Sequence, residues 1–171
     1  KIKMIYLIGY MGSGKTTIAA GLSNMLKLPY VDTDEEIQKK TNFTINEIFK
    51  KFDEIYFRKI EKEIFTNIKG NKIVSTGGGL PIYSDNMKYI KRNGISIYLK
   101  TPIQILHNRL KKSLDNRPLI QKIRKPDLKK FIEQQITERE YFYKQASYIL
   151  ETKDLSKEEI LREIHSFICS R

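Results

Sequence analysis

The chain has 171 residues, of which 40% are hydrophobic and 30% charged, a size and composition that exclude a disordered or fibrous protein. One cysteine, Cys169, and two histidines, His107 and His165, exclude an internal disulfide and leave a zinc site without ligands. The net charge of +12 leaves open a nucleic-acid partner, an anionic small substrate or a solvated lysine-rich face. With no apolar run near the roughly 18 residues that span a bilayer and no signal peptide, we expect a cytoplasmic protein without a membrane partner.

Short apolar runs alternate with amphipathic segments along the chain. The runs predict five strands, at residues 4–8, 29–32, 72–76, 95–99 and about 148–151. Helical spacing predicts a helix at 16–27, a longer helix that stops at Gly70, and a helix from Asp127 to about Ala146. Capping residues predict the starts of four more helices. These starts are a Thr33–Glu36 capping box, a Thr44–Glu47 capping box, a Thr101 cap with Pro102 at the first helical position, and a Ser156–Glu159 cap. This alternation implies an α/β domain over residues 1–171, with a parallel sheet covered by helices on both faces.

The strongest motif is Gly9–Thr16, which reads G-Y-M-G-S-G-K-T and matches the phosphate-binding loop G-x-x-x-x-G-K-[ST]. It lies between a predicted buried strand and a predicted helix. Glycines let consecutive backbone N–H groups face one phosphate, and the positive end of the helix adds to the attraction. Lys15 can reach the β- and γ-phosphates, and the Thr16 hydroxyl can ligate Mg²⁺. We therefore predict a binding site for a nucleoside triphosphate.

Two carboxylates, Asp32 and Asp34, follow at the end of the second predicted strand. Ligands of an open α/β sheet bind outside the carboxyl ends of its strands. Because the two residues are two positions apart on extended chain, we expect both side chains to point toward the γ-phosphate. One would hold Mg²⁺ through water and the other would accept a hydrogen bond from a substrate hydroxyl. For Asp34, a charge that only complements a helix dipole is the alternative.

Two further features allow a functional and a plain structural interpretation. Arg58 is flanked on a predicted helix by Glu54 and Glu61, which by itself is an ordinary surface ion-pair ladder. The glycines at 77–79 follow the third strand and can present backbone amides to a ligand, although a flexible turn is the alternative. The chain has no guanine-reading N-K-x-D tetrapeptide and is short, which favours a nucleoside or metabolite kinase over a GTPase, helicase or transporter.

Taken together, the motifs resemble those of the shikimate kinase family and occur in that family's order. They are Gly12–Thr16, Asp32-x-Asp34, Phe57-Arg58-x-x-Glu61, Thr76–Gly79, Asn116-Arg117-Pro118-Leu119 and Arg139-x-x-x-Tyr143. The resemblance covers nearly the whole chain, is weak around 151–153, and departs from the family at Asp53, where glycine is common. It implies a P-loop kinase fold with a five-stranded parallel sheet in the order 2-3-1-4-5, a substrate-binding segment at about 33–61 and a lid at about 112–124.

The resemblance also implies the reaction, which is transfer of the γ-phosphate of ATP to the 3-hydroxyl of shikimate, with Mg²⁺ as cofactor, by an enzyme expected to be a monomer. It implies catalytic roles for Lys15, Asp34 and Arg117. The residues that it assigns to ATP are Gly12, Ser13, Gly14, Lys15, Thr16, Thr17, Arg109, Arg117 and Lys153. Those that it assigns to shikimate are Asp34, Arg58, Gly78, Gly79 and Arg139, and those that it assigns to the metal are Thr16 and Asp32.

Two of these arginines can also be argued from their positions. Arg139 falls on the apolar stripe of its predicted helix, three residues after Ile136. An arginine on the apolar side needs an anion, because it would otherwise be buried and unpaired. Arg117 lies in a proline-flanked, charge-rich stretch, where a mobile arginine can close over a transferring phosphate.

Two alternatives stay open. A related small P-loop kinase that acts on gluconate or a nucleotide would share the phosphate loop but would not require Arg58 and Arg139 as a pair. A nucleic-acid-binding P-loop protein would use the stretch 100–130, which contains ten basic and two acidic residues. Residues 111–130 lack interleaved aromatic side chains for stacking on bases, so we expect no nucleic-acid partner.

Overall fold

The structure, a computed structural model, describes residues 4–113 and 119–171. Its strands are β1 (Met4–Ile8), β2 (Tyr30–Asp32), β3 (Ile73–Ser75), β4 (Gly94–Lys100) and β5 (Tyr148–Glu151). Its helices are α1 (Lys15–Leu26), α2 (Thr33–Thr41), α3 (Ile45–Lys51), α4 (Glu54–Asn67), α5 (Asn86–Asn93), α6 (Ile103–Lys111), α7 (Leu128–Tyr143) and α8 (Lys157–Cys169), with short 3-10 helices η1 (Leu80–Ile82) and η3 (Lys125–Asp127).

The five strands form one parallel sheet in the order β2-β3-β1-β4-β5. Ile5 of the central strand β1 pairs with Ile73 of β3 on one side and with Ile95 of β4 on the other. The strands predicted from the apolar runs and the strand order implied by the resemblance are both confirmed. Because the strands are parallel, the segments that follow β1, β2 and β3 meet at one edge of the sheet.

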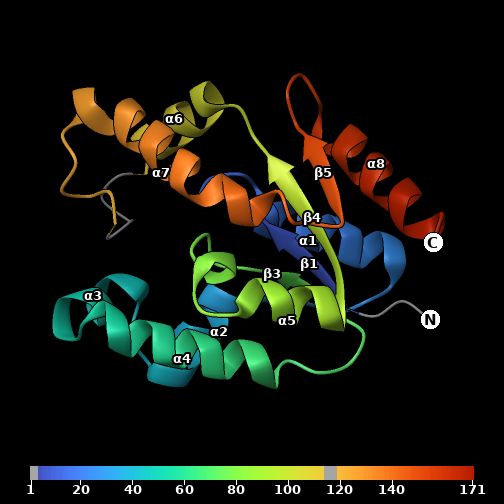
Figure 1. Cartoon of the computed structure of the whole chain (residues 1–171), viewed down its shortest axis with the longest axis horizontal. Helices are drawn as coiled ribbons and strands as arrows, with labels where there is room; N and C mark the ends of the chain where they lie inside the picture. The colour runs from blue at the N-terminus through green and yellow to red at the C-terminus, as the bar shows by residue number, and fades with distance from the viewer. Residues whose placement is uncertain (1–3, 114–118) are drawn as a thin grey trace.

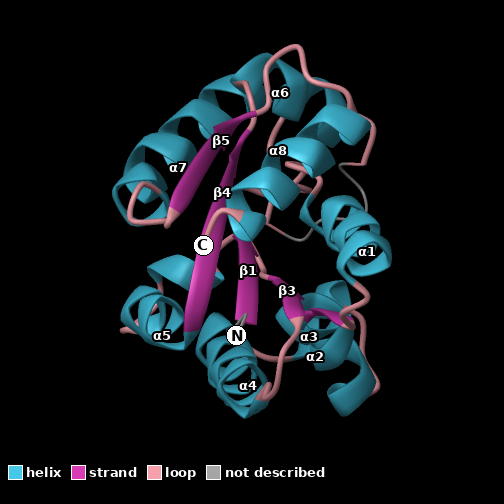
Figure 2. Cartoon of the chain, turned by 90° about the vertical axis from the view of Figure 1, so that its right-hand side faces the viewer, coloured by secondary structure: helices cyan, strands magenta, loops and turns pink. Residues whose placement is uncertain are grey.

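Helices cover both faces of the sheet, as Figures 1 and 2 show. The side chains of β1 alternate between two hydrophobic cores. Tyr6 and Ile8 pack in the core under α4, α5, α6 and α7, whereas Ile5 and Leu7 pack in the core under α1 and α8. All five residues of β1 are buried, as expected for the central strand of a parallel sheet. This rigid strand supports the loop that follows it.

A third and smaller core joins α2, α3 and α4 at one end of the molecule. It contains the buried side chains of Ile37, Ile48, Phe57 and Ile60. The ring of Phe57 also lies 4.9 Å from the ring of Phe49, centre to centre. This packing fixes the rotation of α4 and therefore the direction in which the residues next to Phe57 point.

The start of α2 differs from the sequence prediction. Asp32, rather than Thr33, caps the helix, because its Oδ1 accepts the backbone N–H groups of Asp34 (3.0 Å) and Glu35 (3.4 Å). A carboxylate at the last strand position satisfies the free donors of the first turn directly. The Thr33 hydroxyl instead accepts the backbone N–H of Gly77 at 2.9 Å. The predicted Thr33–Glu36 capping box is therefore wrong.

Two other predicted helix boundaries are also wrong. Pro102 stands at the N-cap of α6 rather than at its first position, and Thr101 does not cap the helix. The Thr101 hydroxyl accepts a hydrogen bond from the Thr152 hydroxyl at 3.1 Å, which joins the ends of β4 and β5. Helix α4 ends before Gly70, whose φ of 85° turns the chain toward β3.

The remaining caps follow from local chemistry. The capping boxes at Thr44 and Ser156 are confirmed, since each hydroxyl accepts the N–H of the glutamate three residues on, and that glutamate accepts the N–H of the cap. Asp53 caps α4 by accepting the N–H of Tyr56 at 2.8 Å. The departure from the family at this position thus serves to begin the helix that carries Arg58.

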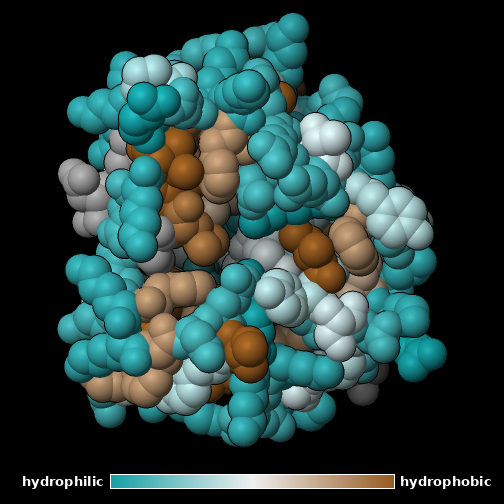
Figure 3. Space-filling view, turned by 60° about the vertical axis from the view of Figure 1, so that its left-hand side comes forward, coloured by the Kyte–Doolittle hydropathy of each residue, from teal (hydrophilic) through white to brown (hydrophobic). Residues whose placement is uncertain are grey.

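The surface shows mixed polarity. On the face drawn in Figure 3, apolar (brown) patches lie in the upper and lower halves, with polar (teal) side chains between them. Within the described ranges, 4–113 and 119–171, no helix combines the length and the apolar character needed to cross a bilayer.

Candidate active site

The predicted phosphate-binding loop connects β1 to α1 and is shaped by its glycines. Gly9, Gly12 and Gly14 have φ values of 144°, 81° and 89°, in the region that favours glycine. Lys15 is 8% exposed, and its Nζ donates hydrogen bonds to the carbonyl oxygens of Gly9 and Tyr10, each at 2.9 Å. The first turn of α1 holds no acidic residue. The loop therefore presents an ammonium group and a positive helix end to one small volume.

Three side-chain oxygens meet beside this loop. Thr16 Oγ1 donates to Asp32 Oδ2 at 2.6 Å, and Ser75 Oγ donates to the same oxygen at 2.8 Å. The contacts join the phosphate loop to the carboxyl ends of β2 and β3. Ser75 was not predicted from the sequence, although a small polar residue at the end of an apolar strand is the signal that could have identified it.

A cavity of about 700 Å³ opens beside the loop at the carboxyl edge of the sheet. The residues assigned to ATP that line it are Gly12, Ser13, Gly14, Lys15, Thr16, Thr17 and Arg109. Arg109 Nη1 donates to the carbonyl of Gly12 at 2.9 Å, which links α6 to the loop. Lys153 is exposed after β5 and does not line this cavity, whereas Lys157 at the start of α8 does. The volume suits a nucleotide-sized ligand.

A second cavity of about 140 Å³ lies next to the first. All five residues assigned to shikimate line it, namely Asp34, Arg58, Gly78, Gly79 and Arg139. Phe49 and Phe57 form part of its apolar wall. Met11, Asp34, Gly77 and Gly78 line both cavities, so these four residues lie at their junction.

The secondary structure that places Asp34 at this junction differs from the prediction. Asp34 lies in the first turn of α2, not on extended chain, because the helix begins immediately after Asp32. The prediction that Asp32 and Asp34 share one side of an extended strand is therefore wrong, although both carboxylates do line the larger cavity. The helix-dipole interpretation of Asp34 also fits its position in the first turn.

The structure shows the ion-pair ladder at Arg58 and also places its side chain at a cavity, which leaves its role in substrate binding a prediction. Its Nη1 donates to Glu61 Oε2 at 2.7 Å, and its Nε and Nη2 donate to Glu54 Oε1 at 3.3 and 3.2 Å. The ladder exists, yet the Arg58 side chain is 11% exposed and lines the smaller cavity. A Cβ at Gly79 would come within 2.5 Å of Arg58 Nη2, so the third glycine makes room for the guanidinium group.

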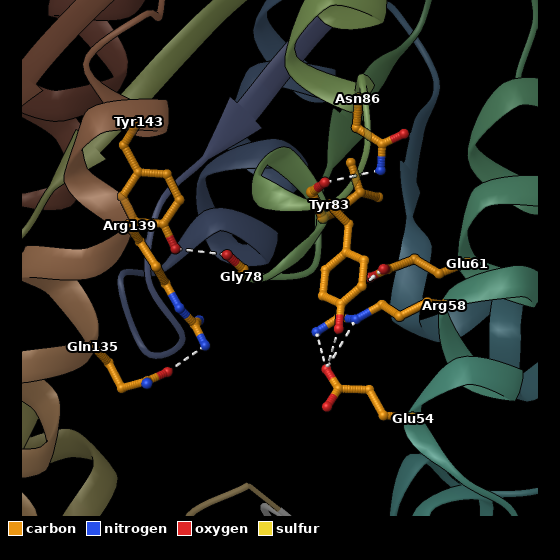
Figure 4. A network of polar contacts seen from close by, with 10 residues as sticks. Glu54, Arg58, Glu61, Gly78, Tyr83, Asn86, Gln135, Arg139 and Tyr143 are labelled. Carbon is orange, nitrogen blue, oxygen red and sulfur yellow. Dashed lines mark hydrogen bonds and ion pairs between the residues drawn. The ribbon is translucent and has the colours of Figure 1, made fainter.

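Arg139 projects from α7 toward the same cavity, from the side opposite Arg58 (Figure 4). Its Nη2 donates to Gln135, and its guanidinium carbon lies 5.3 Å from the centre of the Tyr10 ring. Its Nη1 is buried and has no hydrogen-bond partner among the described residues. A buried guanidinium nitrogen without an acceptor destabilises the protein until an anion completes it. The expectation that Arg139 lies on the apolar side of its helix is confirmed.

Tyr143 anchors the glycine turn to α7. Its hydroxyl donates to the carbonyl of Gly78 at 2.6 Å (Figure 4). Burial raises the pKa of Tyr143 to about 12, so the phenol remains a donor at neutral pH. A Cβ at Gly78 would lie 3.2 Å from the backbone nitrogen of Met11. The absence of a side chain at Gly78 therefore lets the turn pack closely against the phosphate loop.

Glu61 is 1% exposed, which the surface ion-pair interpretation does not predict. Burial raises the pKa of Glu61 to about 7 against the opposing effect of the Arg58 guanidinium, and the charge of Asp34 adds to the rise. Its Oε1 is buried without a hydrogen-bond partner in the part of the chain that the structure describes. The signal was present in the sequence, since Glu61 lies four residues after Phe57 and four before Phe65, on the apolar stripe of α4.

The raised pKa of Glu61 has a measurable effect on stability. Between the ordinary carboxyl pKa and about 7, the folded chain holds a proton that the unfolded chain has released. The stabilisation is complete below the unfolded pKa and is lost as the pH rises through the folded pKa. We expect the free energy of unfolding of the wild type, measured with urea, to fall relative to that of Glu61→Gln between about pH 5 and about pH 8. Glu63→Gln, an exposed change on the same helix, should show no such trend, and a constant difference for Glu61→Gln would contradict the assignment.

Arg117 and part of the predicted lid at 112–124 lie outside the described residues. Leu119, the first residue of the second described range, lines the smaller cavity. The role assigned to Arg117 stays a prediction.

Comparison with known proteins identifies relatives along nearly the whole chain. The family model described as shikimate kinase matches residues 11–169. The shikimate kinase of Flavobacterium psychrophilum is 38% identical over 171 residues, which cover 98% of this chain and 99% of that protein. The shikimate kinase of Persephonella marina is 40% identical over 165 residues, which cover 95% of this chain and 97% of that protein.

Solved structures give the same result. The crystal structure of shikimate kinase from Bacteroides thetaiotaomicron matches with a TM-score of 0.91 and 31% identity, over 98% of this chain and 99% of that one. Shikimate kinase from Acinetobacter baumannii, solved in complex with shikimate, matches with a TM-score of 0.92 and 31% identity, over 99% of this chain and 94% of that one. The chain therefore belongs to the shikimate kinase family, whose members phosphorylate shikimate with ATP.

Proposed function

We propose that the chain acts as one domain over residues 1–171 and transfers the γ-phosphate of ATP to the 3-hydroxyl of shikimate where its two cavities meet. The observation that supports this best is that Asp34, together with Met11, Gly77 and Gly78, lines both cavities. The larger cavity, beside the phosphate loop, has the size for ATP, and the smaller one carries two arginines suited to a carboxylate. In-line transfer requires the attacking hydroxyl and the γ-phosphate to meet, and the junction is where they can do so.

In this proposal the loop glycines Gly12 and Gly14, with Ser13, surround the phosphates of ATP. Lys15 moves its ammonium group from the carbonyls of Gly9 and Tyr10 toward the β- and γ-phosphates. Thr17 and Arg109 contribute from the wall of the larger cavity. Lys153 would contact the nucleotide from outside that wall, and Arg117 would add charge to the transferring phosphate.

The oxygen atoms of Thr16 and Asp32 are suited to Mg²⁺. Both are hard donors, and their 2.6 Å contact places them together beside the phosphate loop. Among residues 4–113 and 119–171, no cluster of three or more His, Cys, Asp or Glu side chains forms a metal site. Proteins usually hold Mg²⁺ with one or two carboxylates together with substrate phosphates. When bound, the ion would neutralise charge on the phosphates.

Shikimate would lie in the smaller cavity with its carboxylate between Arg58 and Arg139. The Nη1 of Arg139, which has no hydrogen-bond partner among the described residues, supplies one donor, and the backbone at Gly78 and Gly79 borders the ring. The 3-hydroxyl would then face Asp34, which accepts its proton as the oxygen attacks the γ-phosphorus. ATP and shikimate are the small-molecule partners in this proposal, and the enzyme acts as a monomer without nucleic acid.

Gly77 offers a test of the junction. A Cβ at this position would lie 2.9 Å from Glu61 Oε1 and 3.0 Å from Asp34 Oδ1. We expect Gly77→Ala to displace Asp34 and to lower kcat by at least about tenfold, because small displacements in an active site are costly. Gly70→Ala is the control, since nothing lies within 4 Å of its Cβ and its φ of 85° makes it the more strained backbone change. Wild-type kcat in Gly77→Ala would show that the junction is not where transfer occurs.

The proposed function is tested by coupling ADP release to a spectroscopic assay with three acceptors, shikimate, gluconate and AMP. We expect turnover with shikimate far above that with the other two, because they lack a ring carboxylate for Arg58 and Arg139. A preference for gluconate or AMP would refute the assignment and favour a related small P-loop kinase.

A further inference from the structure

Tyr83 lines neither cavity, yet it contacts Arg58 closely. It lies between η1 and α5 and is 41% exposed. The centre of its ring is 4.1 Å from the guanidinium carbon of Arg58, and its hydroxyl donates to Glu54 Oε1 at 3.0 Å (Figure 4). The sequence motifs do not include this residue. Its two contacts converge on a side chain that lines the smaller cavity.

The turn that carries Tyr83 is held by side-chain contacts on both sides. Asn86 is 3% exposed, and its Nδ2 donates to the carbonyl of Leu80 at 2.9 Å, while its backbone N–H donates to the carbonyl of Tyr83 at 3.2 Å. Ser84 has a φ of 53°, and its hydroxyl accepts a hydrogen bond from Lys62 of α4 at 3.3 Å. The ring of Tyr83 is therefore presented to Arg58 by a braced turn.

The donors of Arg58 are divided between the protein and the cavity. A guanidinium group has five N–H donors. Two of them, on Nε and Nη2, serve Glu54, and one on Nη1 serves Glu61. Among the described residues this leaves one donor on each of Nη1 and Nη2, which matches the two oxygens of a carboxylate. The orientation of the guanidinium plane therefore decides whether the pair points into the cavity.

We propose that Tyr83 is a positioning residue for shikimate binding. Its ring packs on the guanidinium face of Arg58, and its hydroxyl holds Glu54, which in turn holds the Nε and Nη2 edge. A Cβ at Gly79 would meet the same guanidinium group, but glycine has no side chain with which to restrain it. Tyr83 thus keeps the two remaining donors directed at the substrate carboxylate. The inference rests on the proposed role of Arg58 in binding that carboxylate.

The test compares Tyr83→Leu, which removes the ring, with Tyr83→Phe, which removes only the hydroxyl. We expect Tyr83→Leu to raise the KM for shikimate about five- to tenfold, since a partly buried cation–π contact is lost. Tyr83→Phe should raise it about two- to threefold through the lost hydrogen bond to Glu54. The KM for ATP should stay within about twofold in both variants, because the phosphate loop is a separate site. Thermal unfolding checks that each variant folds, and the phenylalanine variant alone tests the proposal if the leucine variant does not.

A second ligand separates positioning from a general structural effect. The methyl ester of shikimate lacks the charged carboxylate, so its Kd, measured by calorimetry, should be the same in the wild type and in Tyr83→Leu. Tyr30→Leu is the matched control, because Tyr30 is similarly exposed, at 39%, and lines neither cavity. A wild type that does not phosphorylate shikimate would refute the proposed function. If the wild type is active, two results would refute the role of Tyr83. One is an unchanged KM for shikimate in Tyr83→Leu, and the other is a loss of affinity for the methyl ester in Tyr83→Leu as large as the loss for shikimate.

Discussion

Replacing Lys15 with alanine should lower kcat by about 100- to 1,000-fold, because one positioned electrostatic donor to the transferring phosphate is lost. The residue is 8% exposed and is held by two backbone carbonyls of the loop. Alanine also removes these hydrogen bonds, so the free energy of unfolding should fall by about 1 kcal/mol. Steady-state kinetics with saturating ATP and shikimate, together with urea unfolding, separate the two effects.

Lys69→Ala is the matched control for Lys15→Ala. Lys69 also donates to a backbone carbonyl, that of Thr66 at 2.8 Å, but it is exposed and lines neither cavity. We expect it to keep wild-type kcat. If Lys15→Ala retained even a tenth of wild-type kcat, the phosphate-loop lysine would not act on the transferring phosphate.

Replacing Arg139 with methionine should strongly weaken the binding of shikimate, with little loss of folding stability. The side chain has a buried Nη1 without a partner among the described residues, so the unliganded protein loses little when the charge is removed. The substrate carboxylate, in contrast, loses a desolvated partner. We expect the decrease in kcat/KM for shikimate to correspond to a loss of transition-state stabilisation on the order of 2–4 kcal/mol. The free energy of unfolding should change by less than about 1 kcal/mol.

Arg139→Lys distinguishes the fork of the guanidinium group from its charge. An ammonium group keeps the charge but cannot offer two parallel donors, so most of the loss in shikimate kcat/KM should persist. The KM for ATP should move little in either variant. A shikimate kcat/KM within twofold of wild type in Arg139→Met would leave Arg58 as the main partner of the carboxylate.

Local chemistry predicted the strands and most helix starts. Apolar runs such as Met4–Ile8 are buried on both faces, and the capping boxes at Thr44 and Ser156 form as their spacing indicates. The errors at Thr33 and Thr101 share one cause. Each hydroxyl satisfies a tertiary partner, Gly77 or Thr152, that lies far away in the sequence. A pattern confined to a few residues carries no information about such partners.

Site residues could be predicted from the sequence where the local pattern alone requires a particular chemical partner. Arg139 on an apolar stripe indicated an anion, and its place beside the smaller cavity confirms that it faces inward. Ser75 and Tyr83 were not predicted, because each acts through a neighbour supplied by another segment: Asp32 for Ser75 and Arg58 for Tyr83. The pairing of Glu61 with Arg58 was predicted from their helical spacing, but the burial of Glu61 was not. The strand order came from the resemblance alone, since alternation of elements does not determine it.

In the proposed mechanism, Asp34 lies where the phosphate donor and the acceptor meet. A crystal structure of the protein with ADP, Mg²⁺ and shikimate would show whether it does. We expect the phosphates of ADP at the loop that carries Lys15, and the shikimate carboxylate between Arg58 and Arg139, with the 3-hydroxyl within hydrogen-bond distance of Asp34. Shikimate bound with its carboxylate away from both arginines, or with a different hydroxyl nearest Asp34, would refute the proposed role of Asp34.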